Sequence, residues 1–267
     1  MRLVPCSTII LLVMRFKITL IPDSTKENLL PINYQYPLAS WVYKTIATGD
    51  RSYAEWLHAN GFADGSKRFK FFCFSNLSTP RARVNGDRLI LSAEPVTFLL
   101  SFLPERSTEE FVKGVFAQQR ATIGDSISRV SFNVASIEMV PEPVYPETME
   151  FESLSPVVVS AKRPDGTKEY LSPTDARYAK AIIDNLVRKH QVYYGNDPTR
   201  LPSEQFELID EPKLKGVLMQ KKDLVRPVKV IGYRFRFRIT ASPEILRLGY
   251  VGGFGEENSM GFGCVGK

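Results

Sequence analysis

Strictly alternating apolar and polar residues along the first half of the chain are separated by stretches in which apolar residues recur at helical spacing. Alternation is typical of strands, and recurrence every three to four residues is typical of amphipathic helices. We expect strands at residues 15–22, 69–75, 88–92 and 128–140, and helices at residues 37–48 and 52–59. A further helix is expected at Ser107, where Ser107 and Glu110 form a capping box, and Asn85-Gly86-Asp87 predicts a hairpin turn.

The order of these elements predicts the fold class. The sequence β-α-β-β-α-β is that of a ferredoxin-like, or RRM-like, α+β domain. We therefore expect an N-terminal ferredoxin-like domain over residues 14–140, followed by a proline-rich linker at 141–147.

The second half has a related but less regular pattern. A strand is expected at residues 149–161 with a break near Pro156, and a helix from Ser172-Pro173 to about Lys189. Further strands are expected at 205–209, 215–219 and 228–240. Residues 148–267 are therefore predicted to form a second, tandem ferredoxin-like domain.

The strand expected at residues 228–240 has one aromatic and aliphatic face and one basic face. The basic face carries Arg234, Arg236 and Arg238. Most charge runs are simply solvated, so a plain exposed face is one interpretation. Guanidinium groups also bind phosphates and stack on bases, so RNA binding is the other.

Composition narrows the class of protein. The chain has 267 residues, 43% hydrophobic, and a net charge of +6 with a pI near 9.1, which favours a polyanionic partner over a membrane. Its three cysteines are far apart, which favours a reducing cytoplasm and argues against disulfides and a zinc site. With only two histidines we expect no metal and no cofactor.

The apolar residues 9–14 near the N-terminus are too few to span a membrane. No small-residue cleavage site follows them, so export is the minority interpretation. We expect Met14 to lie near the natural start and residues 1–13 to be an upstream extension.

A glycine-bracketed loop at residues 253–263 is the most informative motif. Two Gly-Phe-Gly triplets flank five central residues, and glycine allows both positive φ and close approach of a phosphate chain. The loop predicts RNA binding through its backbone and polar residues, which are Gly253, Gly255, Asn258, Ser259, Gly261 and Gly263. Its centre carries Glu256 and Glu257 and no basic residue, so the two carboxylates must point away or leave the contact to backbone N–H groups.

His58 and Tyr43 have the same place on their helices. Each lies one residue past an apolar stripe, so each side chain is expected to project sideways from a buried face. His190, by contrast, lies on the apolar side of its helix and is expected to pack. Lys67, Arg68 and Lys70 follow His58, so a proton-transfer group, a hydroxyl and cations for a phosphate are close in sequence.

These motifs resemble the CRISPR-associated repeat-processing endoribonucleases, the sixth numbered Cas family of the RAMP superfamily. The resemblance rests on the loop at 253–263, on Tyr36-Pro37, Tyr43 and Trp56-Leu57-His58, on residues 70–75 and on Leu248-Gly249-Tyr250. It spans nearly everything from Met14 to Gly263. It departs from the family pattern in the acidic centre of the loop.

The resemblance implies cleavage of precursor crRNA at CRISPR repeats, without a metal, in a prokaryotic cytoplasm. The ribose 2′-hydroxyl would attack the adjacent phosphate, leaving a 2′,3′-cyclic phosphate and a 5′-hydroxyl. His58 would act as general base or acid and Tyr43 as its partner. Lys70 would stabilise charge on the phosphate, with Lys67 and Arg68 as competitors for that role and as RNA-binding residues.

Two other functions stay open at this point. The chain could hold repeat RNA without cutting it, with other Cas effector subunits or as a homodimer. It could also be an α+β enzyme whose glycine loop binds a nucleotide, although the chain has no Walker pattern and the loop opens no βαβ unit.

Overall fold

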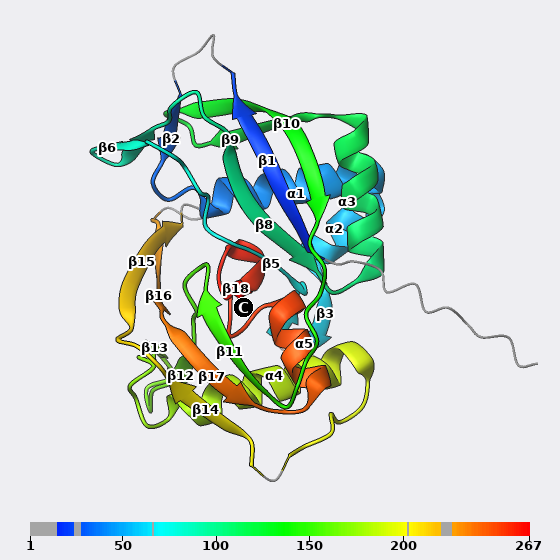
Figure 1. Cartoon of the computed structure of the whole chain (residues 1–267), viewed down its shortest axis with the longest axis vertical. Coiled ribbons are helices and arrows are strands. Elements are labelled where there is room, and N and C mark those ends of the chain that lie inside the picture. Colours follow the sequence, from blue (N-terminus) through cyan, green and yellow to red (C-terminus); the bar gives the residue numbers. More distant parts are fainter. Residues whose placement is uncertain (1–14, 24–27, 66, 202, 220–225) are drawn as a thin grey trace, which may run out of the picture.

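Two antiparallel sheets organise the chain, each with helices against it (Figure 1). The computed structural model describes residues 15–23, 28–65, 67–201, 203–219 and 226–267. The extension expected at residues 1–13 and the start expected at Met14 lie outside the described residues.

The first sheet has five strands in the order β5-β8-β1-β10-β9. The strands are β1 (Arg15–Pro22), β5 (Phe72–Phe74), β8 (Val96–Phe102), β9 (Arg120–Gly124) and β10 (Arg129–Met139). The helices α1 (Gln35–Gly49), α2 (Arg51–Ala59) and α3 (Glu105–Ala117) gather on one side of this sheet (Figure 1). Their apolar faces bury Trp41, Leu57 and Phe111 in one core with the sheet.

The second sheet has four strands in the order β14-β17-β11-β18. The strands are β11 (Thr148–Ser153), β14 (Gln205–Leu208), β17 (Arg236–Thr240) and β18 (Val265–Gly266), and the helices are α4 (Tyr178–Tyr194) and α5 (Pro243–Gly252). A short 3₁₀ helix, η1 (Asn258–Met260), precedes β18. The chain end lies between the two sheets, close to this helix (Figure 1).

Both sheets have the same topology. All neighbouring strands in each sheet are antiparallel. Numbered by their place in the β-α-β-β-α-β order, the strands lie side by side as second, third, first and fourth, and the first sheet has β9 as an extra strand at its edge. The tandem ferredoxin-like fold is therefore confirmed. Residues 140–147 join β10 to β11 without helix or strand, and the domain boundary placed at 141–147 stays a prediction.

Small ribbons extend from the two sheets. They are β2 (Leu29–Pro31) with β6 (Arg83–Asn85) and β7 (Arg88–Ile90), β3 (Phe62–Asp64) with β4 (Lys67–Phe69), β12 (Ser160–Lys162) with β13 (Lys168–Tyr170), and β15 (Lys213–Met219) with β16 (Val228–Arg234). The hairpin turn at 85–87 is confirmed. The strand expected at 88–92 belongs to a ribbon, and the third strand of the first sheet is β8, which was not expected.

Two expected strands are interrupted. The strand predicted at 69–75 breaks at Phe71, whose φ is +52° and whose ring is buried in the second core while Phe72 and Phe74 lie in the first. The strand predicted at 228–240 breaks at Phe235, so that β16 joins a hairpin and β17 joins the sheet. In both places the chain changes the neighbours against which it packs, so one continuous sequence pattern forms two separate strands.

The starts predicted for two of the helices, at Ser107 and at Ser172-Pro173, were wrong. The helix α3 begins at Glu105, and the hydroxyl of Ser107 lies 2.5 Å from that of Tyr53 and caps nothing. The helix α4 begins at Tyr178, because the chain from Ser172 first makes a turn closed by a bond from Asp175 N to Ser172 O.

Candidate functional site

A groove of about 1210 Å³ lies between the two halves of the chain. Its walls are the exposed side of α1, the end of α2 and the β3–β4 hairpin on one side, and the β12–β13 hairpin, α4 and the loop 253–263 on the other. Its lining includes seven basic side chains and three acidic ones. The basic ones are Lys67, Arg68, Lys70, Lys162, Lys168, Arg188 and Lys189, and the acidic ones are Asp64, Glu256 and Glu257. The groove is therefore suited to a polyanion.

Tyr43 and His58 meet at one wall of this groove. Tyr43 is half-buried beside the buried stripe of α1, and His58 is exposed at the end of α2, which Asp50 caps by accepting a 2.9 Å bond from Tyr53 N. The two rings are edge to face, with centroids 5.0 Å apart. The sideways projection expected for both side chains therefore brings them together.

The hydroxyl of Tyr43 is held in its protonated form. Burial raises the pKa of Tyr43, and the nearby side chain of Ser259 opposes this rise. Ser259 belongs to η1 in the glycine loop of the second half, which packs against α1 of the first half. Tyr43 is therefore a hydrogen-bond donor at neutral pH.

Lys70 lies beside the histidine in the break between β4 and β5. Its Nζ donates a 2.8 Å hydrogen bond to the backbone oxygen of His58. Burial, together with the nearby charge of Arg68, lowers the pKa of Lys70 to about 8. Lys67 and Arg68 line the same groove but are exposed, and Arg68 donates to the backbone oxygens of Gly65 and Lys67.

The four glycines of the loop are required by its fold. Gly253, Gly255, Gly261 and Gly263 all have positive φ and are buried. A Cβ at Gly263 would lie 1.9 Å from the backbone oxygen of Phe254. These four positions therefore favour glycine over other residues, for both conformational and steric reasons.

Several backbone N–H groups of the loop donate within the protein. Phe254 N donates to Gly263 O, Gly261 N to Asn258 O, and Gly263 N to Pro156 O. Only residues 255–260 of the loop line the groove, whereas Gly253, Gly261 and Gly263 do not. The predicted loop residues that line the groove are Gly255, Asn258 and Ser259, and an RNA contact at any of the six predicted loop residues stays a prediction.

The acidic centre of the loop is paired. The carboxylate of Glu256 accepts hydrogen bonds from Ser160 Oγ at 2.9 Å and forms an ion pair with Lys168 Nζ at 2.9 Å. The carboxylate of Glu257 lies 3.8 Å from the same ammonium. The β12–β13 hairpin thus offsets the charge that made the loop an unusual phosphate binder.

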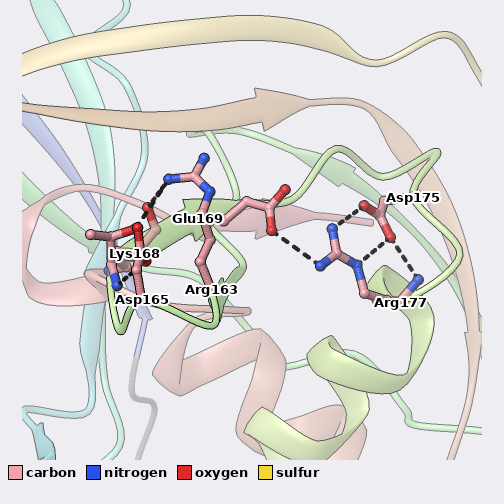
Figure 2. A network of polar contacts seen from close by, with 7 residues as sticks. Arg163, Asp165, Lys168, Glu169, Asp175 and Arg177 are labelled. Atoms are coloured by element: carbon pink, nitrogen blue, oxygen red, sulfur yellow. Dashed lines mark hydrogen bonds and ion pairs between the residues drawn. The ribbon is translucent and has the colours of Figure 1, made fainter.

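The hairpin that carries Lys168 is itself tied down, as Figure 2 shows. Asp165 closes its tip by accepting from Thr167, and Glu169 pairs with Arg177 at 3.1 Å. Arg177 also pairs with Asp175 at 2.7 Å just before α4, so the hairpin is fixed to that helix. Sequence reasoning missed Lys168, although the turn residues Pro164, Asp165 and Gly166 could have indicated the hairpin.

The arginine row lies away from the groove. Arg238 pairs with Glu150 at 2.6 Å and Glu207 at 2.8 Å, and Arg236 lies 3.8 Å from Glu150. Arg234 donates to Ser153 O at 3.2 Å. None of the three lines the groove, and their RNA-binding role stays a prediction.

Within the part of the chain that the structure describes, no group of three or more His, Cys, Asp or Glu side chains could hold a metal ion. Among the same residues, no helix is both long and apolar enough to cross a membrane.

The predicted buried position of His190 is confirmed, since it is 2% exposed.

Comparison with known proteins gives matches along almost the whole chain. Residues 29–138 match the family described as CRISPR-associated protein Cas6, N-terminal, and residues 140–266 match CRISPR associated protein Cas6, C-terminal. The chain is 29% identical over 257 residues to the CRISPR-associated endoribonuclease Cas6 of Pyrococcus furiosus, covering 94% of this chain and 89% of the relative. It is also 29% identical over 257 residues to CRISPR-associated endoribonuclease Cas6 1 of Methanocaldococcus jannaschii, covering 94% and 92%.

A solved structure agrees in fold. The product of a Cas6-related gene from Pyrococcus furiosus superposes with a TM-score of 0.78 at 24% identity, covering 95% of this chain and 97% of that one. The likeness extends over both sheets, since the match covers 95% of this chain.

Proposed function

The chain belongs to the Cas6 family of CRISPR-associated endoribonucleases, and we propose that it cuts CRISPR repeat RNA in the groove between its two halves without a metal ion. The observation that carries the proposal is the meeting of Tyr43, His58 and Lys70 in one basic groove. These are a hydroxyl, an imidazole and an ammonium group from three separate elements. Their combination supplies proton transfer and charge stabilisation for attack on a phosphate.

The reaction follows from the state of each group. The ribose 2′-oxygen attacks the adjacent phosphorus, the bond from phosphorus to the 5′-oxygen breaks, and the products are a 2′,3′-cyclic phosphate and a 5′-hydroxyl. His58 takes the proton from the 2′-hydroxyl, since an imidazole can accept one near neutral pH. Tyr43 keeps its proton because burial raises its pKa, so it donates a hydrogen bond and does not serve as base. The protonated His58 then gives a proton to the leaving 5′-oxygen, which becomes the 5′-hydroxyl.

Lys70 stabilises the extra negative charge on the phosphate. Its bond to His58 O holds the ammonium next to the base. The exposed Lys67 and Arg68 lie further along the same wall and bind the RNA backbone. Ser259 and Asn258 face them from the glycine loop.

Cleavage of labelled repeat RNA from the host's own CRISPR array in excess EDTA tests the proposal. We expect full activity in EDTA, a cyclic phosphate end, and no cleavage when the nucleotide before the scissile bond has a 2′-deoxyribose. That deoxy substrate should still bind. Loss of cleavage in EDTA would overturn metal independence, and binding without any cleavage would identify a subunit that only holds repeat RNA.

Association with other Cas effector subunits and a homodimer are further proposals for this chain. Co-purification with the neighbouring Cas proteins and light scattering of the purified chain test them separately.

A further inference from the structure

Lys189 is a lysine buried almost completely between α4 and the glycine loop, with a side chain 1% exposed. Its Nζ donates to Gly253 O at 2.6 Å, to Gly255 O at 2.7 Å and to Asn258 Oδ1 at 2.7 Å. All three acceptors belong to the loop 253–263. Burial of an ammonium group without a carboxylate partner is unfavourable unless oxygen atoms surround it, and here three loop oxygens do.

The loop is folded around this ammonium. Gly253 and Gly255 have φ of +91° and +67°, and the backbone oxygens of both accept from Lys189 Nζ. Asn258, the third acceptor, donates through Nδ2 to Phe254 O at 2.9 Å and Phe262 O at 3.1 Å. Its side chain therefore joins the two Gly-Phe-Gly arms of the loop to the lysine.

The anchored segment continues directly into the proposed active site. Ser259 follows Asn258 in η1, which packs against α1 and β5. Ser259 and Tyr43 both line the groove where η1 meets α1, and the Tyr43 ring lies against His58. The position of Asn258 thus sets where η1, and with it Ser259, packs beside Tyr43.

We infer that Lys189 is a positioning residue for RNA cleavage, acting through Asn258 and Ser259 on Tyr43. The inference rests on the proposed function, since it assigns a task to Tyr43 in the reaction.

The ends of the loop have other anchors, so the effect of Lys189 is local. Gly263 N donates to Pro156 O at 2.9 Å, and Cys264 N donates to Ser155 Oγ at 3.0 Å. These bonds do not involve Lys189. Glu256 N also donates to Val158 O at 2.7 Å, so the loss of Lys189 should release residues 257–259 while Glu256 and the strand β18 stay in place.

The test is a double-mutant cycle of Lys189→Met and Ser259→Ala in single-turnover cleavage of repeat RNA. We expect each single variant to cut about 10- to 100-fold more slowly, with RNA affinity changed less than about threefold. The double variant should be no slower than the slower single one, because both changes break the same chain of contacts. Lys180→Met is the matched control, since Lys180 is an exposed lysine of the same helix paired with Asp184 at 2.5 Å.

Hydrogen exchange of the loop is measured in the same variants. We expect faster exchange at residues 257–260 in Lys189→Met and unchanged exchange in Lys180→Met. Additive rate losses, or a parallel loss of binding and cleavage, would overturn the inference. If Lys189→Met does not fold, Ser259→Ala alone decides the last link, and an unchanged rate overturns it.

Failure of the proposed function gives a different pattern. A wild-type chain that binds repeat RNA and never cuts it removes the catalytic role of both Tyr43 and Lys189. The exchange measurement then still decides whether Lys189 anchors the loop.

Discussion

The ammonium group of Lys70 donates a 2.8 Å hydrogen bond to the backbone oxygen of His58. The proposed charge stabiliser is therefore fixed to the end of the helix that carries the proposed base. This bond places the ammonium beside the backbone from which the imidazole projects, as charge stabilisation and proton transfer at one phosphate require.

A descending limb in the pH–rate profile follows from this environment. Burial and Arg68 lower the pKa of Lys70 to about 8 from the ordinary 10.5. The ammonium is charged below pH 8 and loses its proton above it, so we expect the single-turnover rate to fall as pH rises through about 8. Lys70→Arg should remove this fall, because a guanidinium stays charged throughout the range. The same fall in Lys70→Arg would assign it to another group.

Removal of the imidazole should affect chemistry far more than binding. We expect His58→Ala to slow cleavage by about 10²–10⁴-fold, the usual contribution of general acid–base catalysis, with the RNA dissociation constant changed less than about threefold. Glu55→Ala is the matched control, since Glu55 is exposed on the same helix and pairs with Arg51 at 2.9 Å. Cleavage by His58→Ala at the wild-type rate would remove His58 from the mechanism.

The acidic pair in the loop leads to a prediction about binding. Lys168 offsets the charge of Glu256 at 2.9 Å. We expect Lys168→Met to weaken RNA binding by about 3- to 10-fold, because a cation is lost and a carboxylate is left facing the phosphates. Adding Glu256→Gln should recover most of that loss in filter-binding measurements at fixed salt. No recovery in the double variant would mean that Glu256 points away from the RNA.

The arginine row of β17 should matter little for binding. Arg238 is already paired with Glu150 and Glu207, so we expect Arg238→Ala to change RNA affinity less than about twofold at fixed salt. Lys67→Ala, in the groove wall, should weaken binding more and reduce the salt dependence of the dissociation constant. A larger effect at Arg238 than at Lys67 would support the original prediction of an RNA-binding arginine face.

The proposed active site could be predicted from the sequence because its signals are local. Tyr43 and His58 each follow a helical apolar stripe by one residue, and this offset is enough to place both side chains at the edge of a buried face. The glycine spacing at 253–263 likewise records a backbone requirement that no other residue meets.

The parts that escaped prediction depend on distant partners. Six of the seven residues of β8, Val96–Phe102, are apolar or small, and packing on both sides leaves no alternation to detect. Phe71 packs in the second core, where its ring contacts the rings of Phe62 and Tyr193. Lys189 looks like an ordinary helical lysine until the loop, 64 residues further on, supplies its acceptors.

A comparison of two glycines predicts how much stability is lost to backbone strain and how much to steric overlap with a new Cβ. Gly263 has φ of +73° and a Cβ there would meet Phe254 O at 1.9 Å, whereas Gly195, at the C-cap of α4, has φ of +75° and open space around it. We expect Gly195→Ala to lower the free energy of unfolding by about 1 kcal/mol, from the left-handed conformation alone. Gly263→Ala should lower it by about 3 kcal/mol or more, because a buried backbone oxygen must also move. Urea unfolding of the two variants compares them directly. Equal losses would show that the loop shifts to admit a methyl group, which would contradict a rigid link from Lys189 to Tyr43.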